Sequence, residues 1–183
     1  KTAVINWLYS KKYAYDFTYI HVISMPEACQ GWAIQACKPW ILNDAFFPQD
    51  ASASKTCGLY LDSDAVIADS GGSLNRLYDN ITQQICHGAA TCDDRVGLVL
   101  EMEEGASWAC VNTGVFLIAN NDVGRNIFKS WIDAQHLPEN EYFKRNWPYE
   151  QAVFENLVGV HNVDPSNVGL WSVPEHPGKV GIT

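Results

Sequence analysis

The stretch that most constrains this chain is GLYLDSDAVIAD, residues 58–69, in which a short apolar run ends in two acids. Residues two apart in an extended strand point to the same face. If residues 59–61 form a buried strand, Asp62 and Asp64 lie together where that strand leaves its sheet. Two carboxylates held together need a cation or a shared proton, and such oxygen ligands suit magnesium, calcium or manganese. A plain polar exit from a strand is the alternative interpretation.

Length and composition bound the class of protein. The 183 residues fit one domain with a sizeable core, and an apolar content of 47% is that of an ordinary globular protein. The net charge of −9 argues against a nucleic-acid partner. No run approaches the roughly 18 apolar residues of a membrane helix, and no signal peptide opens the sequence. We therefore expect no membrane segment in this chain.

The six cysteines give a further hint. None forms a Cys-x-x-Cys pair, which argues against a structural zinc site. Cys86 and Cys92 flank a short loop, and we predict that they form a disulfide. Asn80 begins an N-glycosylation sequon. Together these features favour an oxidising, secretory-pathway setting.

Apolar patterning predicts strands that alternate with helices. Aromatic, β-branched or continuous apolar runs predict strands at residues 16–23, 59–61, 96–100 and 114–119. Helical spacing predicts an N-terminal helix with the stripe Val4, Ile5, Leu8 and Tyr9, and a second helix through residues 32–41 in which Pro39 causes a kink or marks the first turn.

Further helices are predicted after Ser73 and Asp122, each as an N-cap, and over residues 149–157. This alternation predicts an α/β fold, a three-layer sandwich with a central, mostly parallel sheet. Ligands of such sheets bind beyond the carboxyl ends of the strands, which is where Asp62 and Asp64 fall.

Three more segments follow the acidic strand end in a specific order. The first is VNTGVFLI, residues 111–118, which reads as a polar turn leading into a buried strand. The second is EQA, residues 150–152, which opens a helix. The third is HPG, residues 176–178, which lies near the end of the chain. In this order, after a strand ending in LDSDA, they resemble the nucleotide-sugar glycosyltransferases of the GT-A fold. The resemblance is to the family of fungal Golgi galactosyl- and mannosyltransferases and plant xyloglucan xylosyltransferases, and it covers most of the chain. Two features depart from the family: no first strand precedes Lys1, and the histidine motif normally reads His-Phe-x-Gly.

The resemblance implies a metal site. Asp62 and Asp64 match the acids that hold Mn²⁺ (or Mg²⁺) against the donor diphosphate, and His176 matches the third ligand. A divalent cation neutralises the dianionic leaving group without proton transfer. The alternative for His176 is a loop histidine without a functional role.

The resemblance also implies a site for the sugars. Asn112, Thr113 and Gly114 match the segment under the donor sugar and acceptor, Gln151 matches the residue facing the anomeric carbon, and Glu150 is its acidic neighbour. The structural alternative for Asn112 and Gly114 is ordinary turn chemistry. For Glu150 and Gln151 it is the start of a helix, where an acid suits the helix dipole.

The resemblance implies transfer from a nucleotide sugar to a glycan or glycoprotein, with retention of the anomeric configuration. A UDP-sugar is favoured as the donor, with GDP-mannose as the alternative. We expect a single catalytic domain over residues 1–183 that lacks the family's first strand. The expected location is the Golgi or another secretory lumen, and a cytoplasmic or virus-encoded enzyme is the alternative.

Two other classes fit parts of the pattern. LDSDAV also resembles the first motif of haloacid-dehalogenase-like phosphatases, in which Asp62 would be the nucleophile and Asp64 the acid/base. That motif normally follows the first strand of its domain, whereas here it comes mid-chain. A non-catalytic nucleotide- or sugar-binding module is the third interpretation. The seven tryptophans suit sugar stacking, although Trp32, Trp40 and Trp131 lie in apolar helical patterns and are expected in the core.

Overall fold

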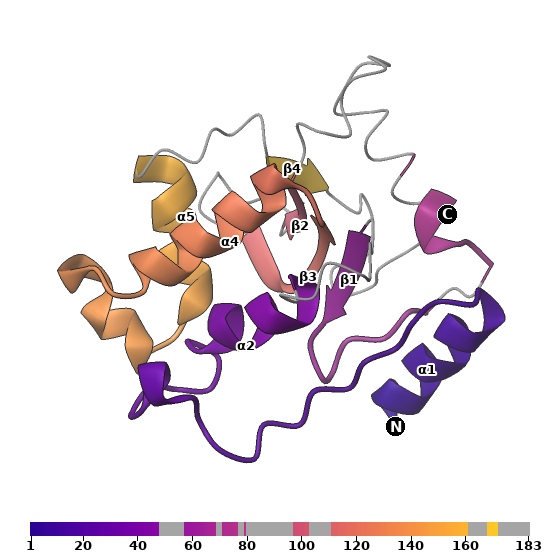
Figure 1. The fold of residues 1–183 in the computed structure, drawn as a ribbon, viewed down its shortest axis with the longest axis horizontal. Helices are drawn as coiled ribbons and strands as arrows, with labels where there is room; N and C mark the ends of the chain where they lie inside the picture. The colour runs from indigo at the N-terminus through magenta and orange to yellow at the C-terminus, as the bar shows by residue number, and fades with distance from the viewer. Residues whose placement is uncertain are drawn as a thin grey trace.

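The structure is a computed structural model that describes residues 1–47, 57–68, 71–76, 79, 97–102, 111–160 and 168–171. It contains helices and strands in mixed order (Figure 1). The elements are α1 (Thr2–Lys12), η1 (Glu27–Cys29), α2 (Lys38–Phe46), β1 (Cys57–Leu61), β2 (Leu98–Met102), β3 (Val111–Ala119), α4 (Asp122–Ala134), η2 (Pro138–Lys144), α5 (Glu150–Val160) and β4 (Val168–Trp171).

The sheet has the strand order β1-β3-β2-β4. Strand β3 pairs antiparallel with both β1 and β2, and only the pair of β2 and β4 is parallel. The prediction of a mostly parallel sheet is therefore wrong for the described strands. For β2 and β3 the reason is the short connection over residues 103–110, since a parallel crossover needs a dozen or more residues.

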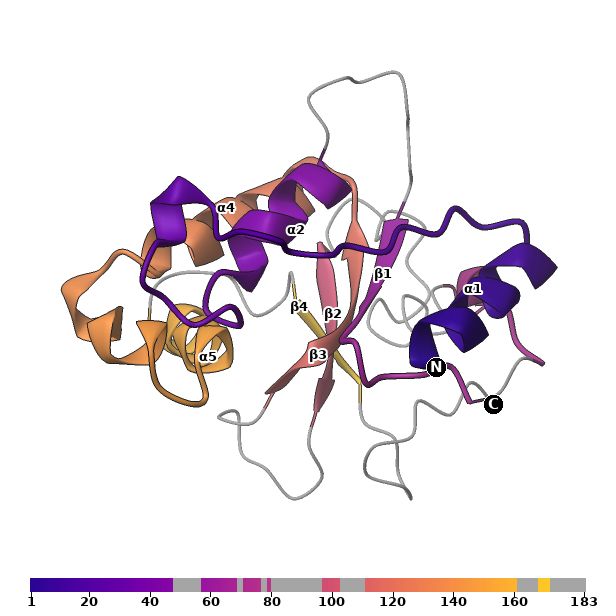
Figure 2. The ribbon, with the colours of Figure 1, turned by 90° about the horizontal axis from the view of Figure 1, so that it is seen from below.

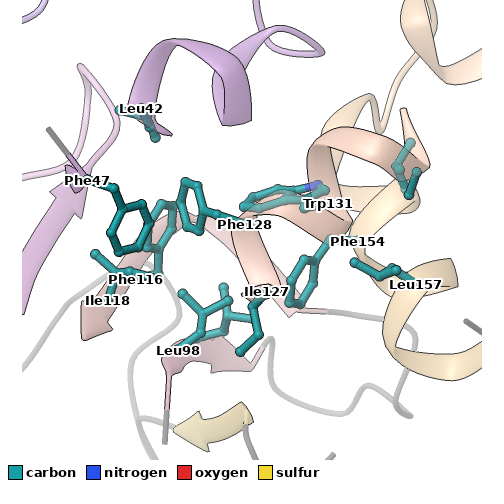
Figure 3. Close-up of a cluster of buried hydrophobic side chains, with 13 residues drawn as sticks. Leu42, Phe47, Leu98, Phe116, Ile118, Ile127, Phe128, Trp131, Phe154 and Leu157 are labelled. Carbon is teal, nitrogen blue, oxygen red and sulfur yellow. The ribbon is translucent and has the colours of Figure 1, made fainter. Parts of the chain in front are cut away.

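Alternate residues of β2 and β3 point to opposite sides of the sheet. Both sides are covered by other elements, so these residues are buried in two separate apolar clusters. On one face Leu98, Leu100, Phe116 and Ile118 pack with side chains of α2, α4 and α5 into the larger apolar cluster (Figure 3). On the other face Val99, Val115 and Leu117 pack with residues that include Tyr9 of α1. Figure 2 shows α2, α4 and α5 on one side of the sheet and α1 on the other. The predicted burial of these two strands is confirmed.

Helix α1 packs through its polar face. Val4, Ile5 and Leu8, predicted as one stripe with Tyr9, are 48–59% exposed, whereas Tyr9 is buried. Asn6 is buried, donates to the carbonyl of Ala65 at 3.0 Å and accepts from the N–H of Ile67 at 3.0 Å. These bonds to the loop after β1 set the rotation of the helix, and the sequence pattern does not report them.

Two predicted elements differ from expectation: one is not formed, and the other is shorter. Residues 16–23 are described but form no strand, and Ile23 is 90% exposed. The second helix begins only at Lys38, with Pro39 in its first turn as one of the two predicted options. Trp32 therefore precedes this helix and is half-buried, as is Trp40. Of the three tryptophans expected in the core, Trp131 is fully buried.

Helix α4 has the predicted apolar face, with Ile127, Phe128 and Trp131 buried. Its N-cap is Asn121, whose side chain accepts a hydrogen bond of 2.8 Å from the N–H of Gly124. The prediction of Asp122 as the cap is wrong by one residue, and Asp122 instead places its charge in the first turn, where it suits the helix dipole. The predicted Ser73 cap is confirmed by its bond of 3.2 Å from the N–H of Arg76.

A disulfide joins Cys29 to Cys37 across a sequence separation of 8 residues. Cys37 is the N-cap residue of α2, so the bridge holds the start of that helix. The predicted pair of Cys86 and Cys92 lies outside the described residues, as does Asn80. Among the residues that the structure describes, no helix is long and apolar enough to span a membrane.

Candidate functional site

The acidic strand end forms a tight turn. The N–H of Asp62 donates to the carbonyl of Gly114 at 2.8 Å, and the N–H of Ala65 donates to the carbonyl of Asp62 at 2.9 Å. The chain is thus not extended from Asp62 to Asp64, so the two side chains do not share a strand face as predicted. The Asp62 side chain is 37% exposed, and Asp64 is exposed. Asp64 is therefore the more accessible of the two acids.

Lys38, the first residue of α2, reaches the same place. It is 9% exposed, and its Nζ lies 3.2 Å from Oδ1 of Asp62 and 2.6 Å from Oε1 of Glu150. It also donates to the carbonyl of Thr113 at 3.3 Å. One buried ammonium group therefore connects the end of β1, the start of β3 and the start of α5.

Tyr60 adds a neutral donor to this cluster. Its hydroxyl donates to Oδ1 of Asp62 at 2.5 Å, and its ring lies 5.3 Å from Nζ of Lys38. Burial, the bond to Asp62 and the negative charges of Asp62, Glu150 and Asp64 all raise the pKa of Tyr60. The phenol is therefore protonated throughout the neutral range and acts as a donor to the Asp62 carboxylate.

The predicted NTG segment lies directly beside Asp62. Oδ1 of Asn112 accepts from the N–H of Gly114 at 2.7 Å. A Cβ at position 114 would lie 2.8 Å from Oδ2 of Asp62 and 2.9 Å from Oδ1 of Asn112. Any larger residue at position 114 would require the side chain of Asp62 or Asn112 to shift.

The start of α5 completes the cluster. Oε1 of Glu150 accepts from the hydroxyl of Thr113 at 3.0 Å, and Oε1 of Gln151 accepts from the N–H of Thr113 at 3.5 Å. The indole N–H of Trp131 donates to the carbonyl of Glu150 at 3.0 Å. Burial raises the pKa of Glu150, while Lys38 and Thr113 act against that rise. The predicted residues of β3 and α5 are thus brought together with Asp62.

A cavity of about 870 Å³ lies along the outer edge of β1. Leu59, Tyr60, Asp62 and Asp64 line it from β1 and from the turn that follows β1. Lys38 of α2 and Phe17, from the segment between α1 and η1, also line it. This volume is within the range of small-molecule sites, which are mostly apolar with a few polar groups. The acidic strand end therefore borders a space large enough for a nucleotide-sized ligand.

The two acids predicted to bind a metal ion, Asp62 and Asp64, lie in different environments. Asp64 is free to offer a carboxylate, whereas Asp62 shares its oxygens with Lys38 and Tyr60. In the described part of the chain no three His, Cys, Asp or Glu residues are grouped to hold a metal ion. His176, the predicted third ligand, lies outside the described residues. A carboxylate such as that of Asp64 suits a hard divalent cation, which commonly completes its shell with oxygens from water or phosphate.

The geometry defines a mixed α/β domain with an acidic strand end beside a cavity of about 870 Å³. Its fold is similar to that of a solved structure described as a glycosyltransferase involved in the glycosylation of the major capsid of PBCV-1. The TM-score is 0.59 at 19% sequence identity, over 93% of this chain and 72% of the other. No protein-family model matches the chain, and no curated protein matches it. The similarity therefore supports a glycosyltransferase fold.

Sequence reasoning missed Lys38 and Tyr60 as members of the site. The segment around Lys38, AIQACKPWIL, carries a single charge within an apolar run. A lysine is almost never buried without a partner, so this isolated charge indicates an acidic partner elsewhere in the chain. Tyr60 precedes Asp62 by two residues in β1 and gave no signal beyond its strand propensity.

Proposed function

We propose that this protein is a metal-dependent glycosyltransferase that moves a sugar from a nucleotide-sugar donor to a glycan or glycoprotein acceptor, with retention. The observation that carries the proposal is the convergence of Asp62, Thr113 and Glu150 on Lys38 at one rim of the sheet. These residues come from the three segments that resemble glycosyltransferase motifs. The similar fold of the glycosyltransferase structure and the adjoining cavity support it.

Within this proposal the cavity along β1 takes the donor nucleotide. Its apolar lining, which includes Phe17 and Leu59, suits a base and ribose, and the acidic end suits a metal-bound diphosphate. A UDP-sugar is the proposed donor, with GDP-mannose as the alternative. We further propose the three-layer GT-A arrangement and membership in the fungal and plant family named above.

The residues have separate roles in the proposed reaction. Asp64, with Asp62, would hold Mn²⁺ or Mg²⁺, and His176 is the proposed third ligand. The bound cation would neutralise the diphosphate leaving group. Gln151, whose Oε1 accepts from the N–H of Thr113 at 3.5 Å, would orient its amide beside the anomeric carbon. Asn112 and Gly114, joined by the bond from the N–H of Gly114 to Oδ1 of Asn112, would lie beneath the donor sugar.

The cellular setting is proposed to be the lumen of the secretory pathway. The disulfide between Cys29 and Cys37 supports this setting, because disulfides persist mainly in oxidising compartments.

Calorimetry with nucleoside diphosphates tests the proposal. UDP should bind to the wild-type protein in the presence of Mn²⁺ and lose most of its affinity in a chelator. Asp64→Ala should remove the dependence on Mn²⁺, because it deletes the most accessible carboxylate of the site. Asp133→Ala is the matched control, since Asp133 is an exposed acid that pairs with Lys129 on α4. Binding of UDP that is equally tight in a chelator would contradict the metal-dependent site.

A further inference from the structure

Lys38 contacts two acids in different environments. The side chain of Glu150 is 5% exposed, and its carboxylate needs a cationic partner because burial of an unpaired charge is costly. The side chain of Asp62 is 37% exposed and is already bonded to the hydroxyl of Tyr60. Charge compensation accounts for the contact of Lys38 with Glu150 but not for its contact with Asp62.

The contact with Asp62 has a geometric consequence. Nζ of Lys38 lies 3.2 Å from Oδ1 and 3.4 Å from Oδ2 of this carboxylate, so it restricts rotation of the group from one side. Tyr60 holds Oδ1 from a second side at 2.5 Å. A partly exposed carboxylate held by two donors is fixed in orientation rather than merely neutralised.

Lys38 also links Asp62 to the start of β3 and the start of α5. The ammonium donates to the carbonyl of Thr113, whose N–H and hydroxyl bond to Gln151 and Glu150 respectively. The position of the strand end and the position of the α5 start are thus connected through one side chain. Lys38 itself is held by helix α2, which begins immediately after the disulfide-bonded Cys37.

We propose that Lys38 is a positioning residue of the donor site, whose ammonium orients the Asp62 carboxylate and sets its place relative to Gln151. This inference rests on the proposed glycosyltransferase function and adds to it a residue that acts through others. In this role Lys38 fixes the direction in which the Asp62 carboxylate faces a metal-bound diphosphate. It contributes no proton and forms no bond to the sugar.

A pair of variants separates positioning from charge compensation. Lys38→Met alone leaves the buried Glu150 without its cationic partner and reduces stability for that reason. Lys38→Met/Glu150→Gln removes both charges, and Glu150→Gln alone is its reference. If Lys38 positions Asp62, the double variant should bind UDP with Mn²⁺ about 10–100-fold more weakly than Glu150→Gln, which is the usual effect of losing an outer-shell partner of a metal ligand. Its kcat for donor hydrolysis should fall in the same direction.

Lys144→Met/Glu141→Gln is the matched control. Lys144 is equally buried at 8% exposure and is paired with Glu141, but it contacts none of the site residues named above. This control should leave UDP affinity and kcat unchanged. If Lys38→Met/Glu150→Gln does not fold, Lys38→Gln/Glu150→Gln replaces it, with a loss in the same direction that is smaller because the glutamine keeps a neutral donor.

The outcomes distinguish the two proposals. If the double variant and Glu150→Gln have the same UDP affinity and the same kcat, Lys38 only neutralises Glu150 and the inference is wrong. If the wild-type protein neither binds UDP with Mn²⁺ nor cleaves a nucleotide sugar, the proposed function fails and the inference fails with it. A wild-type protein that is active, with a selective loss in the double variant, supports both.

Discussion

The backbone N–H of Asp62 donates a hydrogen bond of 2.8 Å to the carbonyl of Gly114. This bond joins two sequence motifs that are far apart in the chain, the acidic end of β1 and the NTG segment of β3. It continues the antiparallel pairing in which Leu61 lies opposite Val115. The sheet register therefore decides which residues meet at the site.

Gly114→Ala should disturb the acid cluster directly. The new Cβ would lie 2.8 Å from Oδ2 of Asp62, and that carboxylate has little freedom to move because Lys38 and Tyr60 hold it. We expect UDP affinity in the presence of Mn²⁺ to fall by roughly tenfold or more, as for other displaced metal-site partners. Calorimetry on the purified variant measures the change.

Gly97→Ala is the control for that experiment. Its Cβ would lie 2.8 Å from the Cα of Gly124, in the packing of α4 on the sheet and away from the acids. Overpacking of this kind typically costs about 1–3 kcal/mol of stability. The control should lower Tm and leave UDP affinity unchanged, and an equal loss of affinity in both variants would show that the effect is not local to Asp62.

Asn6→Ala should destabilise the fold. The Asn6 amide is buried and makes two hydrogen bonds, to the carbonyl of Ala65 and from the N–H of Ile67. Leaving these backbone groups without partners costs about 1–3 kcal/mol in the free energy of unfolding. Val4→Ala, at a position that is 59% exposed, should change it by no more than about 0.5 kcal/mol. Urea denaturation compares them, and an equal effect of both variants would contradict the described packing of α1.

The sequence predicted those parts of the fold that depend on local pattern. Strand β3 and helix α4 are recognised because Phe116, Ile127 and Trp131 belong to continuous or periodic apolar runs. The orientation of α1 was not predictable, because Asn6 outweighs the apolar stripe through contacts to residues 65 and 67. For the same reason the sequence indicated Asp62 but not its partner Lys38. Long-range hydrogen bonds and ion pairs leave no periodic signal.

Peptide mapping of the unreduced protein should show a bridge between Cys29 and Cys37. The bridge closes a short loop, so the chain-entropy model gives it roughly 2–3 kcal/mol of stabilisation. Cys29→Ser/Cys37→Ser should accordingly lower Tm and remove the response of Tm to reductant. Finding both residues as free thiols after purification without reductant would contradict this part of the structure. The same map tests the predicted pair of Cys86 and Cys92.

Asn121→Ala should destabilise α4 more than Asp122→Ala does. Asn121 caps the helix through its bond from the N–H of Gly124, whereas Asp122 lies in the first turn. Loss of such a cap costs about 0.5–2 kcal/mol, and loss of a charge near the helix N-terminus costs about 0.3–1 kcal/mol. Thermal unfolding of both variants gives the order, and a larger effect of Asp122→Ala would assign the cap to Asp122.

Cleavage of nucleotide sugars tests the central claim most directly. Wild-type protein with Mn²⁺ should release nucleoside diphosphate from at least one of UDP-galactose, UDP-glucose, UDP-xylose and GDP-mannose. Gln151→Ala should lower kcat by about 10²–10³ with nearly unchanged donor affinity, as expected for a polar contact made mainly in the transition state. Donor binding without cleavage would indicate a binding module. Release of phosphate from simple phosphomonoesters, abolished by Asp62→Asn and indifferent to Gln151→Ala, with no donor cleaved, would contradict the account.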